Sequence, residues 1–421
     1  MLKEIMIKGL FNQFDYTIIL KDEGITILTG PNGYGKTTIL KIVYFFAVKN
    51  LSFFFQLPFK EIVLTLEKNV ISLTKTDHDT LEVKSGDDKP ITLKKSEYMP
   101  KEMRRLLENT AYRQVDENHW VDRRTDTVLT NESLLNQMIE NDPEILTKYL
   151  KKQMPTFIDV YLIKEQRLLR KAAPMRRRNS PFYYDEEIRE SFSNTIEEYA
   201  KELCRHLQEI LAKASKIGQE LDSSFPRRLF DETDSVSEKD FNKRYGIIKE
   251  KQKALSMYGL SAIKEDSQTS FKTENAKALL VYLDDTEKKL AVFDDVLQKL
   301  EIFSTILNER RFAFKQLEIS SETGFRFKTE KEKDLSLTDL SSGEQQEVVL
   351  LYELLFRVAS NTLVLIDEPE ISLHVAWQKE FLNDILRIIK LQKITVITAT
   401  HSPQIIDTHW NLVVDLEEIS K

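Results

Sequence analysis

The segment that most constrains the fold of this chain is a glycine-rich loop between an apolar strand and a helix. The strand covers Ile25 to Thr29, the loop reads Gly30-Pro31-Asn32-Gly33-Tyr34-Gly35-Lys36-Thr37-Thr38, and helical spacing of apolar residues follows. It matches G-x-x-x-x-G-K-T in the strand-to-helix context that this pattern requires. Glycines let backbone N–H groups point at a phosphate, and the helix N-terminus adds its positive end. A chance glycine-rich turn is the alternative, and the flanking strand and helix argue against it.

This loop predicts a site for a nucleoside triphosphate. We expect Lys36 to bridge the β- and γ-phosphates and the Thr37 hydroxyl to ligate Mg²⁺. The residues expected to contact ATP here are Asn32, Gly33, Gly35, Lys36, Thr37 and Thr38. ATP and Mg²⁺ are therefore the expected cofactors.

A second apolar strand, Thr362 to Ile366, ends in the acidic pair Asp367-Glu368. Ligand-contacting groups of α/β sheets stand at the carboxyl ends of strands, so we expect Asp367 to reach the metal. Glu368, beside the metal rather than on it, is placed to polarise the attacking water as a general base. Alone, this pair would indicate a solvated strand end. Its combination with the phosphate loop favours catalysis.

Two further motifs complete an ordered set. Leu340-Ser341-Ser342-Gly343-Glu344 precedes a helix about twenty residues before the acidic strand, and Ala399-Thr400-His401-Ser402 follows the strand Ile394 to Thr398. The four motifs resemble those of the ABC ATPase superfamily. The resemblance implies that Ser341, Ser342 and Gly343 face the γ-phosphate of ATP bound to a partner subunit. It also implies that His401 contacts the γ-phosphate and is catalytic with Glu368 and Lys36. Without this order, Ser341 would indicate a plain helix N-cap.

Long helices interrupt the strand-rich regions. Apolar residues recur at steps of three or four from Ile188 to Leu221 and from Leu279 to Leu307, with a shorter helical piece from Val236 to Tyr258 between them. Two such stripes predict an antiparallel helical arm, and Phe225-Pro226 is expected to end the first helix.

The remaining segments predict an α/β fold. Alternating segments from Glu61 to Leu93 indicate antiparallel hairpins, Lys101 to Met154 indicates mixed helix and loop, and Phe157 to Ile163 indicates a buried strand. We expect an ABC-type (RecF/SMC-like) split nucleotide-binding head with an inserted, coiled-coil-like antiparallel helical arm. The expected domains are the N-terminal half of the head (1–165), a basic linker (166–185), the arm (186–310) and the C-terminal half of the head (311–421).

Charge and composition limit the partners. The chain has 421 residues, a net charge of −7 and a single cysteine, which cannot form an internal disulfide. The N-terminus carries lysines inside an apolar strand pattern, unlike a signal peptide, so we expect a cytoplasmic protein without a membrane span. A polyanion would need a local patch. The candidate residues for a DNA or partner site are Arg167, Arg170, Lys171, Arg176, Arg177 and Arg178. A solvated loop explains this run equally well.

The run from Asp367 to His374 resembles the E-P-E-x-x-L-H form of the RecF, SMC and OLD group of DNA-linked ATPases. His374 stands where transporter ATPases have an aspartate, which makes transport less expected. Within that group the chain resembles the stand-alone ATPases of bacterial anti-phage systems, of the PARIS type first and of the Septu and retron type second. This implies a head-to-head dimer or larger ring that senses infection and controls a nuclease effector, Toprim-like first and HNH-like second. Since the chain ends soon after its last expected strand, Leu412 to Leu416, we expect that nuclease to be a separate protein.

Several alternatives stay open. The protein could instead be a RecF-like DNA repair ATPase acting directly on DNA, or a structural ATP-binding scaffold with little turnover. The partner could be DNA or a DNA-mimicking phage protein. Gln166 is a candidate third ligand of Mg²⁺, and a surface glutamine is as well supported. Phe11, Asn12 and Phe14 lie where related ATPases contact the base, although core packing explains the phenylalanines equally well.

Overall fold

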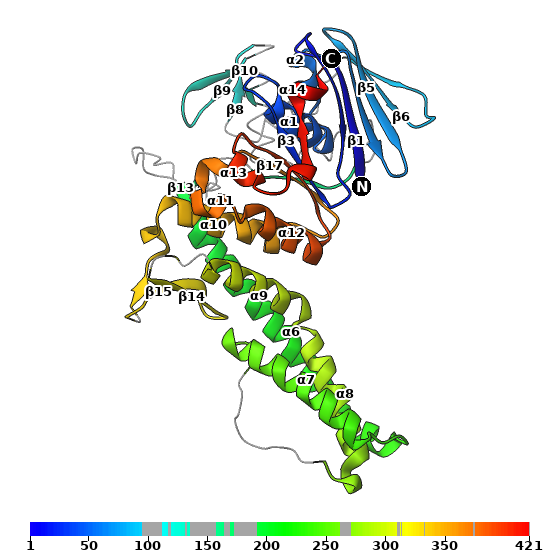
Figure 1. Cartoon of the computed structure of the whole chain (residues 1–421), viewed down its shortest axis with the longest axis vertical. Coiled ribbons are helices and arrows are strands. Elements are labelled where there is room, and N and C mark those ends of the chain that lie inside the picture. Colours follow the sequence, from blue (N-terminus) through cyan, green and yellow to red (C-terminus); the bar gives the residue numbers. More distant parts are fainter. Residues whose placement is uncertain are drawn as a thin grey trace. The chain divides into compact units, whose positions relative to one another are not determined.

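The computed structural model describes residues 1–94, 112–116, 119–130, 133–134, 157–163, 169–171, 192–261, 271–309, 312, 314–331, 333–373 and 375–420. The chain divides into two compact units (Figure 1). The first unit joins Met1–Glu165 with Val358–Ile371 and Gln378–Lys421, and the second joins Gln166–Arg357 with Ser372–Trp377. Segments from both ends of the chain therefore build the first unit around a long insertion.

A parallel sheet forms the centre of the first unit. Its strand order is β11-β17-β18-β3-β19, and all neighbouring pairs are parallel. The strands are β3 (Ile25–Thr29), β11 (Val160–Ile163), β17 (Leu363–Asp367), β18 (Thr395–Ala399) and β19 (Val413–Asp415). The first four residues of β17 are completely buried, as expected for a strand covered on both faces. The helix α1 (Lys36–Ala47) packs against β11, β17 and β18, and α12 (Phe381–Gln392) lies between β17 and β18 in the chain.

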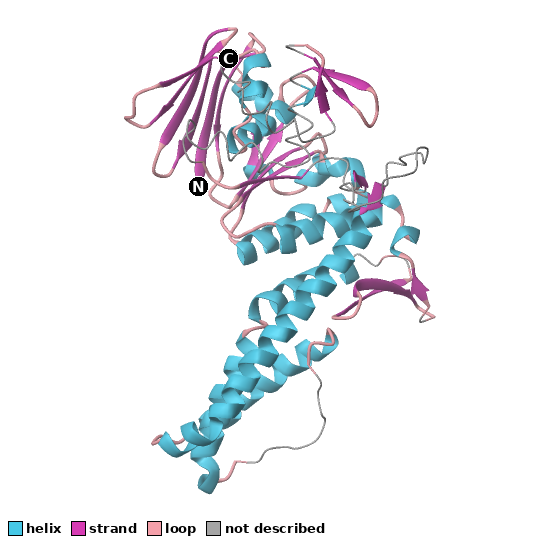
Figure 2. Ribbon diagram, turned by 180° about the vertical axis from the view of Figure 1, so that it is seen from behind, coloured by secondary structure: helices cyan, strands magenta, loops and turns pink. Residues whose placement is uncertain are grey.

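The predicted hairpins form an antiparallel sheet in the same unit (Figure 2). Its order is β2-β1-β4-β5-β6-β7, with β1 (Leu2–Leu10), β2 (Phe14–Ile19), β4 (Glu61–Leu66), β5 (Val70–Asp77), β6 (Thr80–Ser85) and β7 (Ile91–Lys94). Side chains alternate between buried and exposed along β4 to β6, which is the pattern of a sheet with one face on a core. One apolar cluster joins this sheet, α1 and the parallel sheet, with Ile5, Ile42 and Leu365 among its members.

The region from 112 to 130 corrects one expectation. Instead of helix and loop, its described residues form a three-stranded antiparallel sheet of β8 (Tyr112–Gln114), β9 (His119–Asp122) and β10 (Thr127–Thr130). The strands are short and rich in polar residues, so their period was not visible in the sequence. Trp120 and Asp122 are buried, and Arg124 binds the Asp122 carboxylate at 2.7 Å, which offsets the cost of burying its charge.

The helical arm of the second unit contains α6 (Thr195–Asp231), α7 (Glu238–Met257), α8 (Ala276–Ala291) and α9 (Asp294–Glu309). Ion pairs fix the relative direction of two of them. Asp222 and Arg228 of α6 bind Lys289 and Asp285 of α8 respectively, so α6 and α8 are antiparallel. The predicted α/β fold, with a split head and an inserted antiparallel helical arm, is confirmed.

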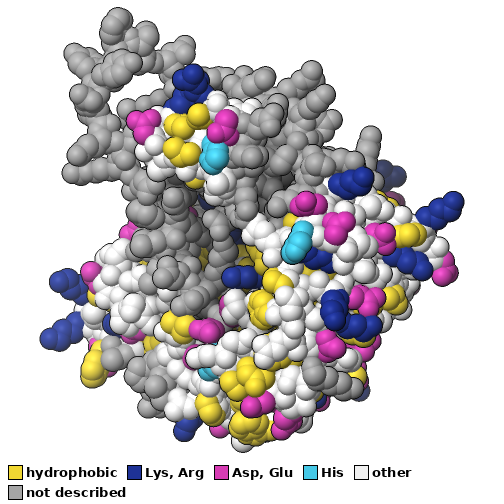
Figure 3. All heavy atoms as spheres, turned by 90° about the horizontal axis from the view of Figure 1, so that it is seen from above, with side chains coloured by type: hydrophobic (Ala, Val, Ile, Leu, Met, Phe, Trp, Pro, Cys, Tyr) yellow, Lys and Arg dark blue, Asp and Glu magenta, His cyan; other side chains and the backbone are white. Residues whose placement is uncertain are grey.

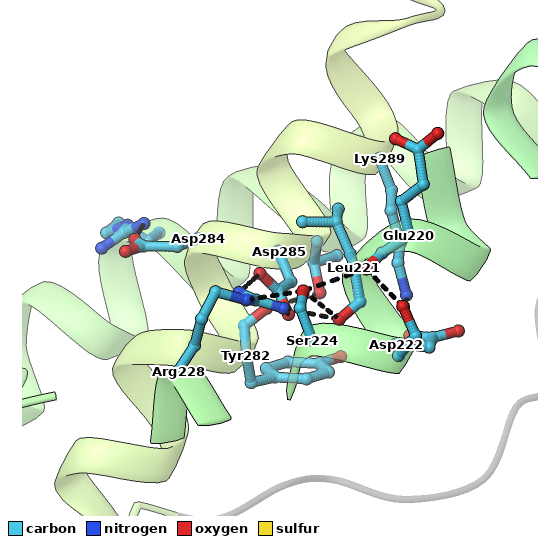
Figure 4. A network of polar contacts seen from close by, with 12 residues as sticks. Glu220, Leu221, Asp222, Ser224, Arg228, Tyr282, Asp284, Asp285 and Lys289 are labelled. Atoms are coloured by element: carbon cyan, nitrogen blue, oxygen red, sulfur yellow. Dashed lines mark hydrogen bonds and ion pairs between the residues drawn. The ribbon is translucent and has the colours of Figure 1, made fainter. Parts of the chain in front are cut away.

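Pro226 does not end the first helix, contrary to expectation, because α6 continues to Asp231. Proline removes one backbone donor and disturbs the preceding turn. Figure 4 shows how side chains bind the carbonyl groups of that turn. Arg228 donates to the Leu221 carbonyl at 2.6 Å, and Ser224 donates to it at 3.2 Å. The same guanidinium pairs with the buried Asp285 carboxylate of α8, so packing against a neighbouring helix holds the chain helical through the proline.

Two other arm boundaries differ from the expected ones. Phe192 lies in a short strand, β13 (Phe192–Asn194), paired with β12 (Leu169–Lys171), rather than in the first helix. The second stripe is divided between α8 and α9, although Phe293 at the break stays buried. Asp294 and Asp295 then occupy the first turn of α9, where a helix N-terminus favours acidic side chains.

The second unit also contains an antiparallel sheet and a further helix. The sheet has the order β14 (Lys315–Ser320), β15 (Gly324–Thr329) and β16 (Asp334–Leu335), and α10 (Ser342–Tyr352) follows it. A π-helical turn, Glu353–Arg357, follows α10.

Charged groups of both signs share the described surface. On the face drawn in Figure 3, Lys and Arg side chains are interspersed with Asp and Glu side chains. Within the described residues, no helix is both long and apolar enough to cross a membrane.

Candidate active site

The phosphate loop joins the carboxyl end of β3 to the N-terminus of α1. Gly33 and Gly35 have φ angles of 90° and 85°, a region that L side chains rarely adopt. A Cβ at Gly35 would also lie 3.1 Å from Leu10 and 3.2 Å from Phe11. Local backbone and close packing therefore both require glycine at this position.

Lys36 is the first residue of α1, and its side chain turns back over the loop. Its ammonium group donates to the carbonyls of Gly30 at 2.7 Å and Pro31 at 3.1 Å. Lys36 is only 6% exposed. Burial lowers its pKa, although nearby carboxylates, first those of Glu368 and Glu370, oppose the shift. The loop thus holds a buried cation among carboxylates.

Asp367 meets the phosphate loop directly. It is the last residue of β17, and its Oδ1 accepts a hydrogen bond from the Thr37 hydroxyl at 3.1 Å. Glu368 follows with φ 44°, which is uncommon for a residue with a side chain, and its N–H donates to the Ala399 carbonyl at 2.9 Å. Strained residues of this kind are frequent at active sites.

His401 lies in the turn after β18, the neighbour of β17. Its Nε2 is 3.8 Å from Oε1 of Glu368, and its backbone N–H donates to Oε1 of Glu370 at 2.6 Å. In the same turn, the Ser402 hydroxyl donates to Oε1 of Gln378 at 2.8 Å. The turns after the two central strands are therefore tied together beside the phosphate loop.

Aromatic residues border the loop on the antiparallel sheet. The rings of Phe14 and Tyr34 lie 5.2 Å apart, and the Tyr16 hydroxyl donates to the Tyr34 carbonyl at 2.8 Å. Burial raises the pKa of Tyr16 to about 12. Phe11 and Asn12 form the turn after β1 with positive φ angles, whereas Phe14 already belongs to β2.

The Ser341 to Gly343 loop belongs to the second unit, where it begins α10. Ser341 is the N-cap: its hydroxyl accepts from the Glu344 N–H at 3.3 Å, and its own N–H donates to the Glu344 carboxylate at 2.7 Å. This reciprocal pair is a capping box. Lys315 of β14 donates to both carboxylate oxygens of Glu344, at 2.8 and 2.7 Å. An ion pair with little exposure therefore holds the start of α10.

The structure brings five of the predicted residues to one end of the parallel sheet: Lys36, Thr37, Asp367, Glu368 and His401. Other predicted residues lie outside the described part of the chain, namely Gln166, Arg167, Arg176, Arg177, Arg178 and His374. Arg170 and Lys171 belong to β12, of which only the backbone is described.

Sequence reasoning missed Glu370, Gln378 and Lys315. No motif marks Gln378 or Lys315, because their contacts depend on how distant segments pack. Only Glu370 carried a signal, since a carboxylate two residues after Glu368 stands close to the same strand end.

The donors at this site fit Mg²⁺ bound together with a phosphate. Among the described residues, no group of three or more His, Cys, Asp or Glu side chains could hold a metal ion by itself. Mg²⁺ in nucleotide sites uses one or two protein oxygens and completes its shell with phosphate oxygens and water. The Thr37 hydroxyl and the Asp367 carboxylate, 3.1 Å apart, form such an incomplete set of oxygen ligands.

The family model described as "AAA ATPase domain" matches residues 1–406. The chain belongs to this family. The match includes all the motif residues considered above, so the protein carries an ATPase domain, and its fold is an α/β head split around an insertion that contains a helical arm.

The curated relatives match only part of the chain. A "probable iron chelatin transport ATP-binding protein", found in two strains of Helicobacter pylori, is 33% identical over 93 residues. The matched part is 22% of this chain and 35% of those proteins. The chain thus spans about a third of the length of the curated relatives that it matches.

Similar solved structures include two heads of SMC proteins. The SMC head domain from Thermotoga maritima is 11% identical with a TM-score of 0.33, and the match covers 96% of this chain and 90% of that one. The Smc head with a coiled coil and joint from Pyrococcus yayanosii is 13% identical with a TM-score of 0.34, over 98% and 94% of the two chains. The fold assignment rests on the sheet order described above.

Proposed function

We propose that this protein binds ATP with Mg²⁺ at the end of the parallel sheet, hydrolyses it, and closes head to head with a second copy around the nucleotide. The observation that carries this proposal is the contact between Thr37 and Asp367, with Glu368 and His401 beside it. Residues from distant parts of the chain meet there. Together they supply the groups that ATP hydrolysis requires: a phosphate-binding loop, oxygen ligands for Mg²⁺ and a carboxylate beside the metal.

In this proposal the phosphate loop binds the triphosphate. Backbone N–H groups of Asn32 to Thr38 and the N-terminus of α1 receive the phosphates, and the Lys36 ammonium moves from its carbonyl partners to the β- and γ-phosphates. Thr37 and Asp367 would hold Mg²⁺, with Gln166 as the third candidate ligand. When bound, Mg²⁺ neutralises charge that develops on the transferred phosphoryl group.

Glu368 and His401 would act side by side at the reacting phosphate. Glu368 accepts a proton from the attacking water as general base. His401 donates a hydrogen bond to the γ-phosphate. The 3.8 Å between Nε2 of His401 and Oε1 of Glu368 places both side chains within reach of one water molecule.

The second copy would supply Ser341, Ser342 and Gly343 to the γ-phosphate. Two features support this role. The N-terminus of α10 offers backbone donors to an anion, and Lys315 neutralises Glu344, whose charge would otherwise repel a phosphate. In such a dimer, the binding and hydrolysis of ATP would control whether the two copies associate.

The output that we propose for this cycle is control of a separate nuclease, Toprim-like before HNH-like, in the cytoplasm during anti-phage defence. The resemblance of both ATPase halves to the stand-alone ATPases of anti-phage systems supports it, whereas the Asp367 to His374 run and the inserted arm resemble the wider RecF, SMC and OLD group. The predicted domains (1–165, 166–185, 186–310 and 311–421) remain part of this proposal. Salt-dependent DNA binding lost on replacing Arg176 to Arg178 would favour the RecF-like alternative instead.

The variant Glu368→Gln tests the hydrolytic core of the proposal. It keeps the size and polarity of the side chain and removes the general base. We expect phosphate release to fall at least about 100-fold, because general base catalysis contributes factors of this size. With hydrolysis blocked, we expect ATP to shift the protein from monomer to dimer in size-exclusion chromatography with light scattering.

The matched control is Glu209→Gln, an exposed glutamate on α6. It should hydrolyse ATP at the wild-type rate and show no stable ATP-bound dimer. A Glu368→Gln protein with unchanged turnover would contradict the catalytic assignment and favour a structural ATP-binding scaffold.

A further inference from the structure

We propose that Glu370 is a positioning residue for His401, and therefore a determinant of the hydrolysis rate. The inference rests on the proposed function, in which His401 contacts the γ-phosphate. Glu370 lies in η5 (Pro369–Ser372), two residues after Glu368. It is thus part of the turn that follows β17, whereas His401 belongs to the turn that follows β18.

The contact between these turns is short and charge-assisted. Oε1 of Glu370 accepts the backbone N–H of His401 at 2.6 Å. Hydrogen bonds to an ionised carboxylate are stronger than those between neutral groups. Because the bond holds the backbone of His401, it fixes the point from which the imidazole extends toward Glu368.

A second link runs parallel to the first. Gln378 is 8% exposed, and its Nε2 donates to the Glu370 carbonyl at 3.3 Å while its Oε1 accepts from the Ser402 hydroxyl at 2.8 Å. Two consecutive residues, His401 and Ser402, are therefore tied to the turn after β17. A turn held at two adjacent points has little freedom to swing its histidine away from the phosphate site.

The other carboxylate oxygen shows that Glu370 has a role beyond closing a loop. Oε2 is buried, and within the described part of the chain it has no hydrogen-bond partner. A buried, unsatisfied carboxylate oxygen is costly for folding. The charge lies within electrostatic range of the Lys36 ammonium, which offsets part of this cost.

The test is a double-mutant cycle on the whole chain with ATP and Mg²⁺. Glu370→Leu removes the acceptor and should lower kcat about 10- to 100-fold, the usual effect of losing a group that orients an active-site ligand. KM should change less than threefold. Glu370→Gln, whose side-chain carbonyl can still accept from His401, should recover most of the lost kcat.

Non-additivity separates positioning from a general structural effect. On a His401→Ala background the backbone N–H remains but the imidazole is gone, so Glu370→Leu should cost no further kcat. Glu209→Leu on α6 is the matched control and should leave kcat unchanged on both backgrounds. Thermal unfolding of each variant shows whether a low kcat reflects loss of folded protein.

Three results would overturn the inference: wild-type kcat in Glu370→Leu, an equal loss of kcat on both backgrounds, or no recovery in Glu370→Gln. These results are distinct from a failure of the proposed function. If His401→Ala alone keeps the wild-type kcat, the assigned role of His401 is wrong and the role of Glu370 falls with it.

Discussion

Lys36 is nearly buried, and its charge is expected to favour ATP binding while lowering the stability of the folded chain. Its folded-state pKa is lowered by burial, so the charged form is less favourable in the folded chain than in the unfolded chain. Below both pKa values the lysine is charged in the folded and in the unfolded chain, and the lowered pKa therefore means a loss of stability there. We expect Lys36→Met to leave the Tm unchanged or raise it by a few degrees. ATP affinity should fall about 100-fold, because charge-assisted bonds to phosphate are lost.

Differential scanning fluorimetry and isothermal titration calorimetry on the same sample measure both effects. A Lys36→Met protein that binds ATP within threefold of wild type would contradict the assigned role of the loop. A large drop in Tm would show that the Gly30 and Pro31 contacts matter more than the burial of charge.

Glu344 predicts a dependence of stability on pH. Burial alone would raise its pKa, but the hydrogen bonds from Lys315 and Ser341 outweigh burial and bring the pKa below 4.5. A depressed carboxyl pKa contributes stability that is complete above the unfolded-state value and is lost as pH falls through the folded-state value. The difference in unfolding free energy between wild type and Glu344→Gln should therefore be constant from about pH 5 to 7 and shrink below about pH 4.5.

Urea unfolding at a series of pH values gives this difference. Glu209→Gln, on the exposed face of α6, serves as the control and should show no such trend. A difference that grows as pH falls would mean that the pair with Lys315 does not stabilise the ionised form of Glu344.

At the scale of elements, the contact between β15 and α6 depends on Gly324. This glycine has φ 74°, and a Cβ there would lie 1.8 Å from the Ala200 carbonyl oxygen. The sheet can approach the helix this closely only without a side chain. We expect Gly324→Ala to lower the free energy of unfolding by about 2 kcal/mol or more, through strain and overpacking together.

Gly246→Ala is the control for that change. Gly246 lies inside α7, and apart from its chain neighbours and the nearby backbone of that helix no atom lies within 4 Å of the position of an added Cβ. Alanine there should stabilise the protein by about 0.5 to 1 kcal/mol, because glycine is a poor helix former. Chemical unfolding of both variants tests the pair. Equal effects would contradict the close approach of β15 to α6.

Most elements were predictable because their periods are strong and local. The strands from Ile25 to Thr29 and from Thr362 to Ile366, and the hairpins after Glu61, all follow the expected patterns. The errors arose where tertiary contacts override local rules. Pro226 should end a helix, yet Arg228 and Asp285 hold the turn together. The short strands around Trp120 have no visible period.

The residues of the candidate site likewise include some that the sequence predicts and some that it does not. Lys36, Asp367 and His401 were predictable because each stands in a motif whose spacing reflects its chemistry. Glu370 and Lys315 were not, because each acts on a residue that lies at least 29 positions away in the chain. The spacing of residues in a sequence predicts contacts within one turn or helix. Contacts between distant segments can be seen only in the folded structure.

At the scale of the whole molecule, the proposed reaction needs both compact units. The phosphate loop and the acidic pair lie in the first unit, and Ser341 to Gly343 lie in the second. In the proposed dimer each nucleotide is held by the first unit of one copy and the second unit of the other. Two variants, each defective in a different unit, should therefore restore an intact nucleotide site when they form a mixed dimer.

Complementation between Lys36→Met and Ser341→Arg tests this claim most directly. Each variant alone should be inactive, since both of its composite sites are defective. In an equimolar mixture, half of the dimers are mixed and each has one intact site, so about a quarter of the wild-type rate should return. No recovery of phosphate release in the mixture, or normal turnover by Ser341→Arg alone, would contradict a nucleotide clamped between two copies.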